Sequence, residues 1–218
     1  MDIAFVSTKN LLHDKYRPFT FLMDASMLGV GVGFDIRGAD ILLIRGIDYH
    51  APAQNYVIPD SREGWVEALK LTLQSHFEHL PRVEFDFTQI RPKNVPIKGF
   101  GGKASGYECL EQLLKQVNNI LSHRQGAHMT GRDIVDIMNL IGCCVVAGNV
   151  RRTAEIAFGD PYDEEYLNLK NYQLNPERGE FGWTSNNSIF CNLGMDYSKV
   201  ADITSKNGEP GELNKFLY

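Results

Sequence analysis

The chain has 218 residues, of which 43% are hydrophobic and 22% are charged, a balance that is typical of a folded domain and excludes wholesale disorder. Its 22 basic and 27 acidic residues give a net charge of −5, which argues against DNA or RNA binding because that needs a clustered basic excess. No apolar run approaches membrane-spanning length, so no membrane association is expected. Four cysteines are too few for a disulfide scaffold, which predicts a reducing, cytoplasmic location.

The hydrophobic patterns predict strands and helices in alternation. Because the two are mixed along the whole chain, an α/β or α+β arrangement is favoured. In chain order we expect a buried strand at 3–6, a helix at 19–28, a glycine-rich strand at 29–34, a strand at 41–44, a helix from 60, a half-buried strand at 84–87, helices at 107–122 and 130–141, buried strands at 144–147 and 154–158, and a short helix at 163–170.

Two helix starts carry capping signals. Asp60 is a good N-cap residue, and Glu63 follows three residues later, as in a capping box. Thr130 and Asp133 predict a second start of the same kind.

Two segments are rich in glycine. Residues 29–33 alternate glycine with valine, which predicts either a tightly packed strand or one that a ligand approaches closely. They are not a dinucleotide fingerprint, because the third glycine of that motif is missing and no helix opens there. Residues 99–106 hold four glycines and form the most permissive backbone of the chain.

Histidines and cysteines offer weaker candidates. His76 and His79 lie three apart on a predicted helix, but nothing nearby completes a zinc site, so surface or cap positions are favoured. The adjacent Cys143 and Cys144 lie among apolar residues and are predicted to be buried, since reactive thiolates need electropositive surroundings.

The segment 148–152 places two adjacent arginines directly after an apolar stretch. Together with a glycine and an amide, the guanidiniums of Arg151 and Arg152 offer hydrogen bonds to phosphate, ribose or base edges. A solvated charge pair is the alternative, and the residues alone leave both open.

Several segments, in this order along the chain, resemble the adenosylcobalamin-dependent (class II) ribonucleotide reductases, especially the monomeric triphosphate reductases. Each motif alone is weak, but the ordered series covers nearly the whole chain, and 145–155 is the most specific part. The matching segments are 18–22, 31–34, 59–66, 90–92, 99–106, 139–142, 145–155, 183–188 and 207–211.

The resemblance implies an α/β fold that is the N-terminal part of a ten-stranded α/β barrel of the ribonucleotide reductase type. Residues 1–218 then form one partial barrel domain, in which 35–98 are an effector-binding helical insertion. It also implies an adenosylcobalamin-dependent ribonucleoside-triphosphate reductase, which reduces ribonucleotides to deoxyribonucleotides through a cysteine thiyl radical. The expected partners are a ribonucleotide substrate, a deoxynucleoside triphosphate effector and a thioredoxin-like reductant.

The resemblance also assigns binding residues. The backbone at Val30 and Gly31 approaches the substrate. A specificity loop, which relays the identity of the effector to the substrate base, consists of Ala147, Gly148, Asn149, Val150, Arg151 and Arg152. The glycine-rich loop contributes Gly101, Gly102, Lys103 and Ser105.

Some family features are not found in these residues. The finger loop with the radical cysteine does not occur, and Ile3 stands where one reducing cysteine is expected. We therefore assign no catalytic and no metal-binding residue, expect the missing C-terminal half of the barrel as a further partner, and predict that the isolated chain does not reduce nucleotides. The alternative is a non-catalytic nucleotide-binding or interaction module derived from the reductase.

Overall fold

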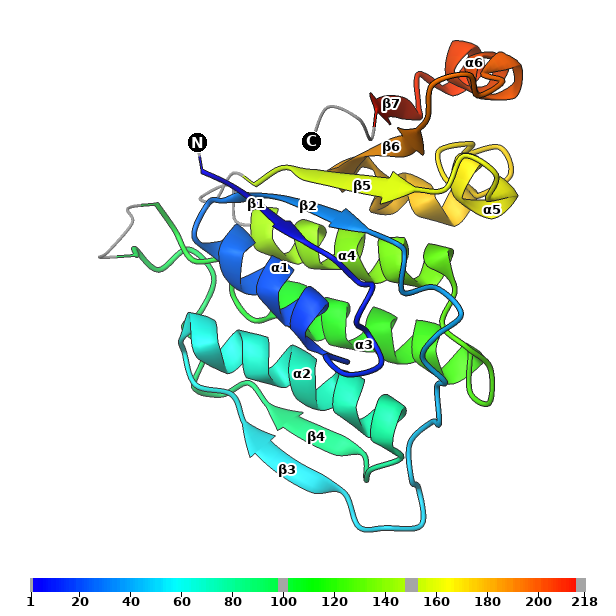
Figure 1. The fold of residues 1–218 in the computed structure, drawn as a ribbon. Helices are drawn as coiled ribbons and strands as arrows, with labels where there is room; N and C mark the ends of the chain where they lie inside the picture. The colour runs from blue at the N-terminus through cyan, green and yellow to red at the C-terminus, as the bar shows by residue number, and fades with distance from the viewer. Residues whose placement is uncertain (1, 98–101, 148–152, 215–218) are drawn as a thin grey trace.

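A five-stranded parallel sheet forms one side of the protein (Figure 1). The structure is a computed structural model that describes residues 2–97, 102–147 and 153–214. Every neighbouring pair in the sheet is parallel. In spatial order its strands are β1 (Ile3–Val6), β2 (Gly31–Asp35), β5 (Glu155–Gly159), β6 (Ser185–Cys191) and β7 (Gly211–Asn214).

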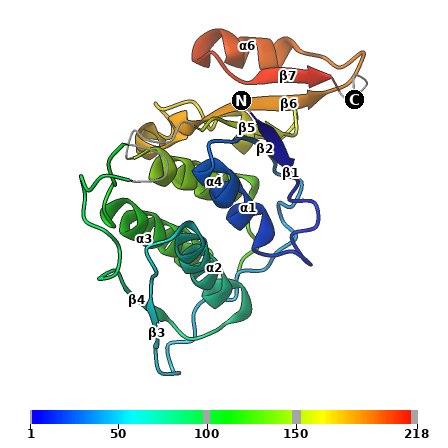
Figure 2. The ribbon, with the colours of Figure 1, turned by 90° about the vertical axis from the view of Figure 1, so that its left-hand side faces the viewer.

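Helices cover one face of this sheet in two layers, and a small second sheet lies beyond them (Figures 1 and 2). The layer next to the sheet holds α1 (Arg17–Met27) and α4 (Gly131–Val146), and the next holds α2 (Arg62–Glu78) and α3 (Glu108–His123). The outer sheet pairs β3 (Gln54–Val57) with β4 (Val83–Asp86) in parallel. The remaining helices are α5 (Glu164–Leu167), α6 (Ser198–Asn207) and the 3₁₀ turns Pro176–Glu180 and Gly182–Thr184.

The α/β class predicted from the sequence is confirmed. The ten-stranded barrel stays a prediction, because the described residues form an open sheet of five strands. Most predicted helices are present, and the capping box of Thr130 and Asp133 is formed at the start of α4. Among the described residues, no helix has the length and apolar character needed to cross a bilayer.

Several local predictions are wrong. The segment 41–44 is not a strand, because its backbone bonds to the turn before α4 through a single bridge rather than a ladder. Residues 144–146, predicted as a strand, continue α4. The N-cap of α2 is Ser61, whose side chain accepts from the Gly64 amide, and not Asp60. His76 is buried, whereas His79 does cap its helix, in the left-handed conformation.

The helix-free face of β1 is exposed, which corrects the prediction of a buried strand. Ile3 is 84% exposed and Phe5 is 49% exposed. Phe5 reaches across β2 to Phe158, with 6.0 Å between the ring centroids. Gly33 makes this contact possible, because a Cβ there would lie 2.9 Å from the Phe5 ring and 3.3 Å from Ile156.

Candidate functional site

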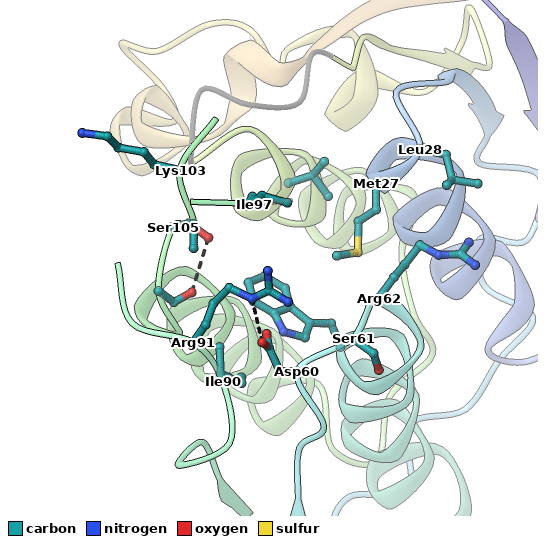
Figure 3. A pocket seen from close by; sticks show the side chains of 14 residues that line it. Met27, Leu28, Asp60, Ser61, Arg62, Ile90, Arg91, Ile97, Lys103 and Ser105 are labelled. Atoms are coloured by element: carbon teal, nitrogen blue, oxygen red, sulfur yellow. Dashed lines mark hydrogen bonds and ion pairs between the residues drawn. The ribbon is translucent and has the colours of Figure 1, made fainter. Parts of the chain in front are cut away.

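A cavity of about 270 Å³ lies where four segments meet (Figure 3). The start of α2 forms one wall, and the chain between β4 and α3 forms another. The C-terminal ends of α1 and α4 close it on the side of the main sheet. The lining residues are Met27, Leu28, Asp60, Ser61, Arg62, Trp65, Ile90, Arg91, Ile97, Lys103, Ala104, Ser105, Gly106 and Val145.

Three cationic side chains line this cavity, hereafter the α2 cavity. Nε of Arg91 donates to the Asp60 carboxylate at 2.6 Å, and Figure 3 shows this pair beside the start of α2. Arg62 is engaged by Asp24 at 2.6 Å and by Glu63 at 2.7 Å. Lys103 is exposed and makes no salt bridge to the described residues. Because carboxylates pair with both arginines, the positive charge available to an anionic occupant comes from Lys103 and from any exchange of Asp60 or Asp24 for the ligand.

The sequence at 59–65 explains why α2 starts at the wall of this cavity. Ser61 is extended and caps the helix with its hydroxyl, so the partial positive charge of the α2 N-terminus lies at the cavity. Gly64 packs against the preceding turn, since a Cβ there would lie 2.6 Å from the Pro59 carbonyl oxygen. Trp65, one turn into the helix, brings a large aromatic surface to the same wall.

The predicted substrate-contact residues lie at the start of β2. The Val30 carbonyl accepts a hydrogen bond of 2.8 Å from the Thr153 hydroxyl, which also bonds to the Ser26 hydroxyl at 3.2 Å. Gly31 opens β2 and pairs with Ile3. The chain that follows the predicted specificity loop is therefore tied directly to the backbone of Val30.

Only the first residue of the predicted specificity loop lies in the described chain. Ala147 is exposed and ends α4, two residues after Val145 of the α2 cavity. Gly148, Asn149, Val150, Arg151 and Arg152 lie outside the described residues.

The glycine-rich loop contributes Lys103 and Ser105 to the lining of the α2 cavity, and Figure 3 shows the Lys103 side chain extending outward from it. Gly102 does not line it but has a φ of +83°, a conformation that glycine adopts without strain. Gly101 lies outside the described residues.

Sequence reasoning did not single out four residues of this region: Asp60 and Arg62 as charged lining, Trp65 as an aromatic wall, and Thr153 as the link to Val30. A signal for Arg62 was present, since it lies at a predicted helix N-terminus, where backbone N–H groups favour an anion. The Thr153 contact had no local signal, because Val30 lies 123 positions away.

Glu155, the first residue of β5, carries a buried carboxyl group two residues after Thr153. Glu155 accepts a 3.2 Å hydrogen bond from the Asn139 amide, and its other oxygen has no hydrogen-bond partner among the described residues. Burial raises the pKa of Glu155 to about 8, although the Asn139 hydrogen bond and the charge of Lys170 oppose the shift. The group is therefore mostly protonated at neutral pH.

Residues 44–121 match the family model for the insertion domain of B12-dependent ribonucleotide reductases. This range contains two walls of the α2 cavity, the start of α2 and the chain between β4 and α3. It also overlaps the region 35–98 that the resemblance assigned to an insertion. Over this part of the chain, the match confirms the resemblance to the class II ribonucleotide reductases that the motifs predicted.

The chain is also similar to curated proteins that are named adenosylcobalamin-dependent ribonucleoside-triphosphate reductases. The chain is 51% identical to a probable adenosylcobalamin-dependent ribonucleoside-triphosphate reductase of Dictyostelium discoideum and 53% identical to the adenosylcobalamin-dependent ribonucleoside-triphosphate reductase of Euglena gracilis, each over 95% of this chain. The Lactobacillus leichmannii reductase of that name is 35% identical over 90% of this chain. The chain spans 29%, 28% and 31% of the lengths of these relatives, respectively.

The fold matches a solved crystal structure of a B12-dependent (class II) ribonucleotide reductase. The TM-score is 0.79 at 30% sequence identity, over 97% of this chain and 36% of that one. The parallel sheet and its helical layers are therefore those of this segment of the solved enzyme.

Proposed function

We propose that this chain is the part of an adenosylcobalamin-dependent ribonucleoside-triphosphate reductase that binds a deoxynucleoside triphosphate effector and relays its identity to the substrate. The effector occupies the α2 cavity. The relay runs through residues 147–152 to the backbone at Val30 and Gly31.

One observation carries this proposal: the residues on either side of the predicted specificity loop contact two different places. One side lines the α2 cavity, and the other is bonded to the backbone of Val30, which is predicted to approach the substrate. Val145, just before the loop, lines the α2 cavity. Thr153, just after it, donates to the Val30 carbonyl at 2.8 Å. A ligand that moves Val145 is therefore linked to Thr153 along the chain through seven intervening residues, 146–152, by which the two sites can be coupled.

The chemistry of the α2 cavity suits a nucleoside triphosphate. The α2 N-terminus, Arg91 and Lys103 supply positive charge for phosphates. Trp65 supplies an aromatic face on which a base can stack. A volume of about 270 Å³ is close to the lower end of the range of ligand pockets.

In the complete enzyme, adenosylcobalamin would supply the radical that starts the reduction, and a thioredoxin-like reductant would supply the electrons. The cavities lined by the described residues have volumes of about 210 to 690 Å³, which is too small to enclose a corrin with its nucleotide tail. We therefore assign no residue of this chain to the cofactor and derive no step through it.

Calorimetric titration of the 218-residue chain with each of the four deoxynucleoside triphosphates tests the effector site. We expect saturable binding of at least one of them, and at least about tenfold weaker binding in the Lys103→Ala and Trp65→Ala variants, since each loses a contact of one to two kcal/mol. Lys115→Ala is the matched control, because Lys115 is an exposed lysine of α3 that pairs with Glu111 and lies outside the cavity.

Two results would contradict the proposal. One is binding that the two cavity variants and the Lys115 control alter equally. The other is the absence of binding by all four nucleotides at millimolar concentration.

A further inference from the structure

Three of the four cysteines gather around one cavity of about 220 Å³, separate from the α2 cavity. Cys109 comes from the first turn of α3, and Cys143 and Cys144 come from the last turn of α4. The two helices pack against each other and are joined by a short connection, which brings the start of one to the end of the other. All four cysteines are in the reduced form in the structure.

Cys109 lies in surroundings that favour a thiolate. It is partly accessible, lines the cavity, and lies 3.4 Å from the Ser105 hydroxyl. A hydrogen bond with the Cys144 thiol, together with contributions from Ser105 and from the backbone amides of Leu110 and Cys109 itself, lowers the pKa of Cys109 to about 6 against the opposing effect of burial. The amides are those of the α3 N-terminus, where helix geometry presents unbonded N–H groups to an anion.

The two cysteines of α4 differ from each other. Cys144 is buried and is the hydrogen-bond partner of Cys109. Cys143 points instead to the Glu180 carbonyl, at 3.9 Å from its Sγ. Burial and the nearby Glu155 raise the pKa of Cys143 to about 11, so it stays a thiol at neutral pH. Consecutive residues of a helix face different directions, and only Cys144 faces Cys109.

We propose that Cys109 and Cys144 are a redox-active pair that a hydroperoxide converts reversibly to a disulfide, with Cys109 as the attacking thiolate and Cys144 as the resolving thiol. The Cys109 sulfur attacks one peroxide oxygen, the O–O bond breaks, and Cys109 becomes a sulfenic acid while hydroxide leaves. The Cys144 sulfur then attacks the Cys109 sulfur, and the S–O bond breaks. The departing hydroxyl takes the Cys144 proton and leaves as water. Two electrons pass from the sulfurs to the peroxide, and a dithiol reductant returns them.

The position of the pair gives the disulfide a structural consequence. Cys109 follows the glycine-rich loop by three residues, and Cys144 precedes Ala147 by three. A covalent S–S bond is shorter than a contact between two thiols, so oxidation draws the α3 start toward the α4 end and fixes both. This inference rests on thiol chemistry and on the helix pair, and it stands whether or not a nucleotide occupies the α2 cavity.

Peptide mapping of the purified 218-residue chain tests the pair. After treatment with stoichiometric hydrogen peroxide and alkylation of the remaining thiols, we expect a peptide pair linked through Cys109 and Cys144, which a dithiol reductant separates. In Cys144→Ser, dimedone should trap a sulfenic acid at Cys109 instead. Cys143→Ser is the matched control, an adjacent cysteine of the same helix, and should form the linked pair as the unaltered chain does.

The rate at which each thiol is alkylated gives a second test, which does not require the disulfide to form. At pH 7 we expect iodoacetamide to modify Cys109 at least about tenfold faster than Cys143, because the larger thiolate fraction of Cys109 outweighs its lower intrinsic nucleophilicity. A peroxide-induced bridge that requires Cys143, a Cys109 that reacts no faster than Cys143, or oxidation that stops at the sulfenic acid in the unaltered chain would each overturn the proposal.

Discussion

Asp60 and Arg91 form an ion pair of 2.6 Å that joins the start of α2 to the chain after β4, at the wall of the α2 cavity. Both side chains are partly exposed, so the pair itself adds less than about 1 kcal/mol to the stability of the fold. The Asp60 carboxylate does, however, compete with any anion for the Arg91 guanidinium. The pair therefore bears more on ligand affinity than on folding.

The first prediction follows from this competition. Asp60→Asn removes a negative charge from the cavity and frees Arg91, so deoxynucleoside triphosphate should bind about three- to tenfold more tightly, with a larger dependence of affinity on salt. Arg91→Ala should weaken binding by about tenfold or more. Titration calorimetry at two salt concentrations measures both. Equal losses of affinity in the two variants would indicate that the ion pair only holds the wall in place.

A second prediction concerns the buried arginine below α4. Arg178 has no exposed surface and donates to Asp136 at 2.7 Å, to Asn139 at 3.2 Å and to the Leu169 carbonyl. Arg178→Met leaves the Asp136 carboxyl buried without this partner and should lower the free energy of unfolding by about 3 to 5 kcal/mol.

Urea denaturation measures this loss of stability. Two further variants show whether the unpaired buried charge of Asp136 causes it. Adding Asp136→Leu to Arg178→Met should recover most of the stability, because no buried charge is then left unpaired. Arg82→Met is the control, since Arg82 pairs with Glu84 on the surface and its loss should cost less than about 1 kcal/mol. A double variant no more stable than the single one would refute the explanation.

The sequence predicted elements best where a local signal matched the tertiary environment. The capping box at Thr130 is local and formed as expected. The end of α4 was predicted as a strand because a short apolar run cannot distinguish a buried strand from a buried helix. The strand β6 was not predicted, since its start is polar. Ser185 and Asn187 are nevertheless buried there: the Ser185 hydroxyl donates to the Asn187 side-chain oxygen at 3.0 Å, and the backbone N–H of Asn187 donates to Glu209.

The residues of the candidate site also differ in whether the sequence alone could identify them. The resemblance to the reductases singled out the Val30 region and the glycine-rich loop, and their binding roles stay predictions. The meeting of Asp60 with Arg91, and of Thr153 with Val30, could not, because each pair is distant in the sequence and only the packing of the helices brings it together. The cysteine pair was missed for the same reason, since Cys109 and Cys144 lie on different helices.

A third prediction tests the close packing of α4 against the sheet. A Cβ at Gly142 would lie 2.3 Å from the Glu155 carboxyl and 3.2 Å from Thr184 Cβ. Gly142→Ala should therefore lower the free energy of unfolding by about 1 to 3 kcal/mol, in spite of the gain in helix propensity. Gly179→Ala is the matched control, because nothing lies within 4 Å of its added Cβ, and thermal unfolding should separate the two. Equal melting temperatures would show that Glu155 moves aside at little cost.

The last prediction concerns the pH dependence of stability that Glu155 imposes. Its pKa is raised from 4.5 to about 8, mainly by burial. Below pH 4.5 the carboxyl is protonated in both folded and unfolded chains, and its contribution to stability is fully present. Between pH 4.5 and 8 only the folded chain keeps the proton, so the free energy of unfolding falls as the pH rises. Above pH 8 both states are ionised, and the contribution has been lost.

Glu155→Gln removes this titration but keeps the size of the side chain and a hydrogen bond with Asn139. The stability of the unaltered chain relative to the variant should therefore decline from pH 5 to pH 9, by up to about 5 kcal/mol for a shift of this size. Urea denaturation across this range measures the difference, with Glu180→Gln as an exposed control whose curve should run parallel to that of the unaltered chain. A parallel curve for Glu155→Gln as well would mean that the folded protein holds Glu155 ionised, with Lys170 or another cation compensating its charge.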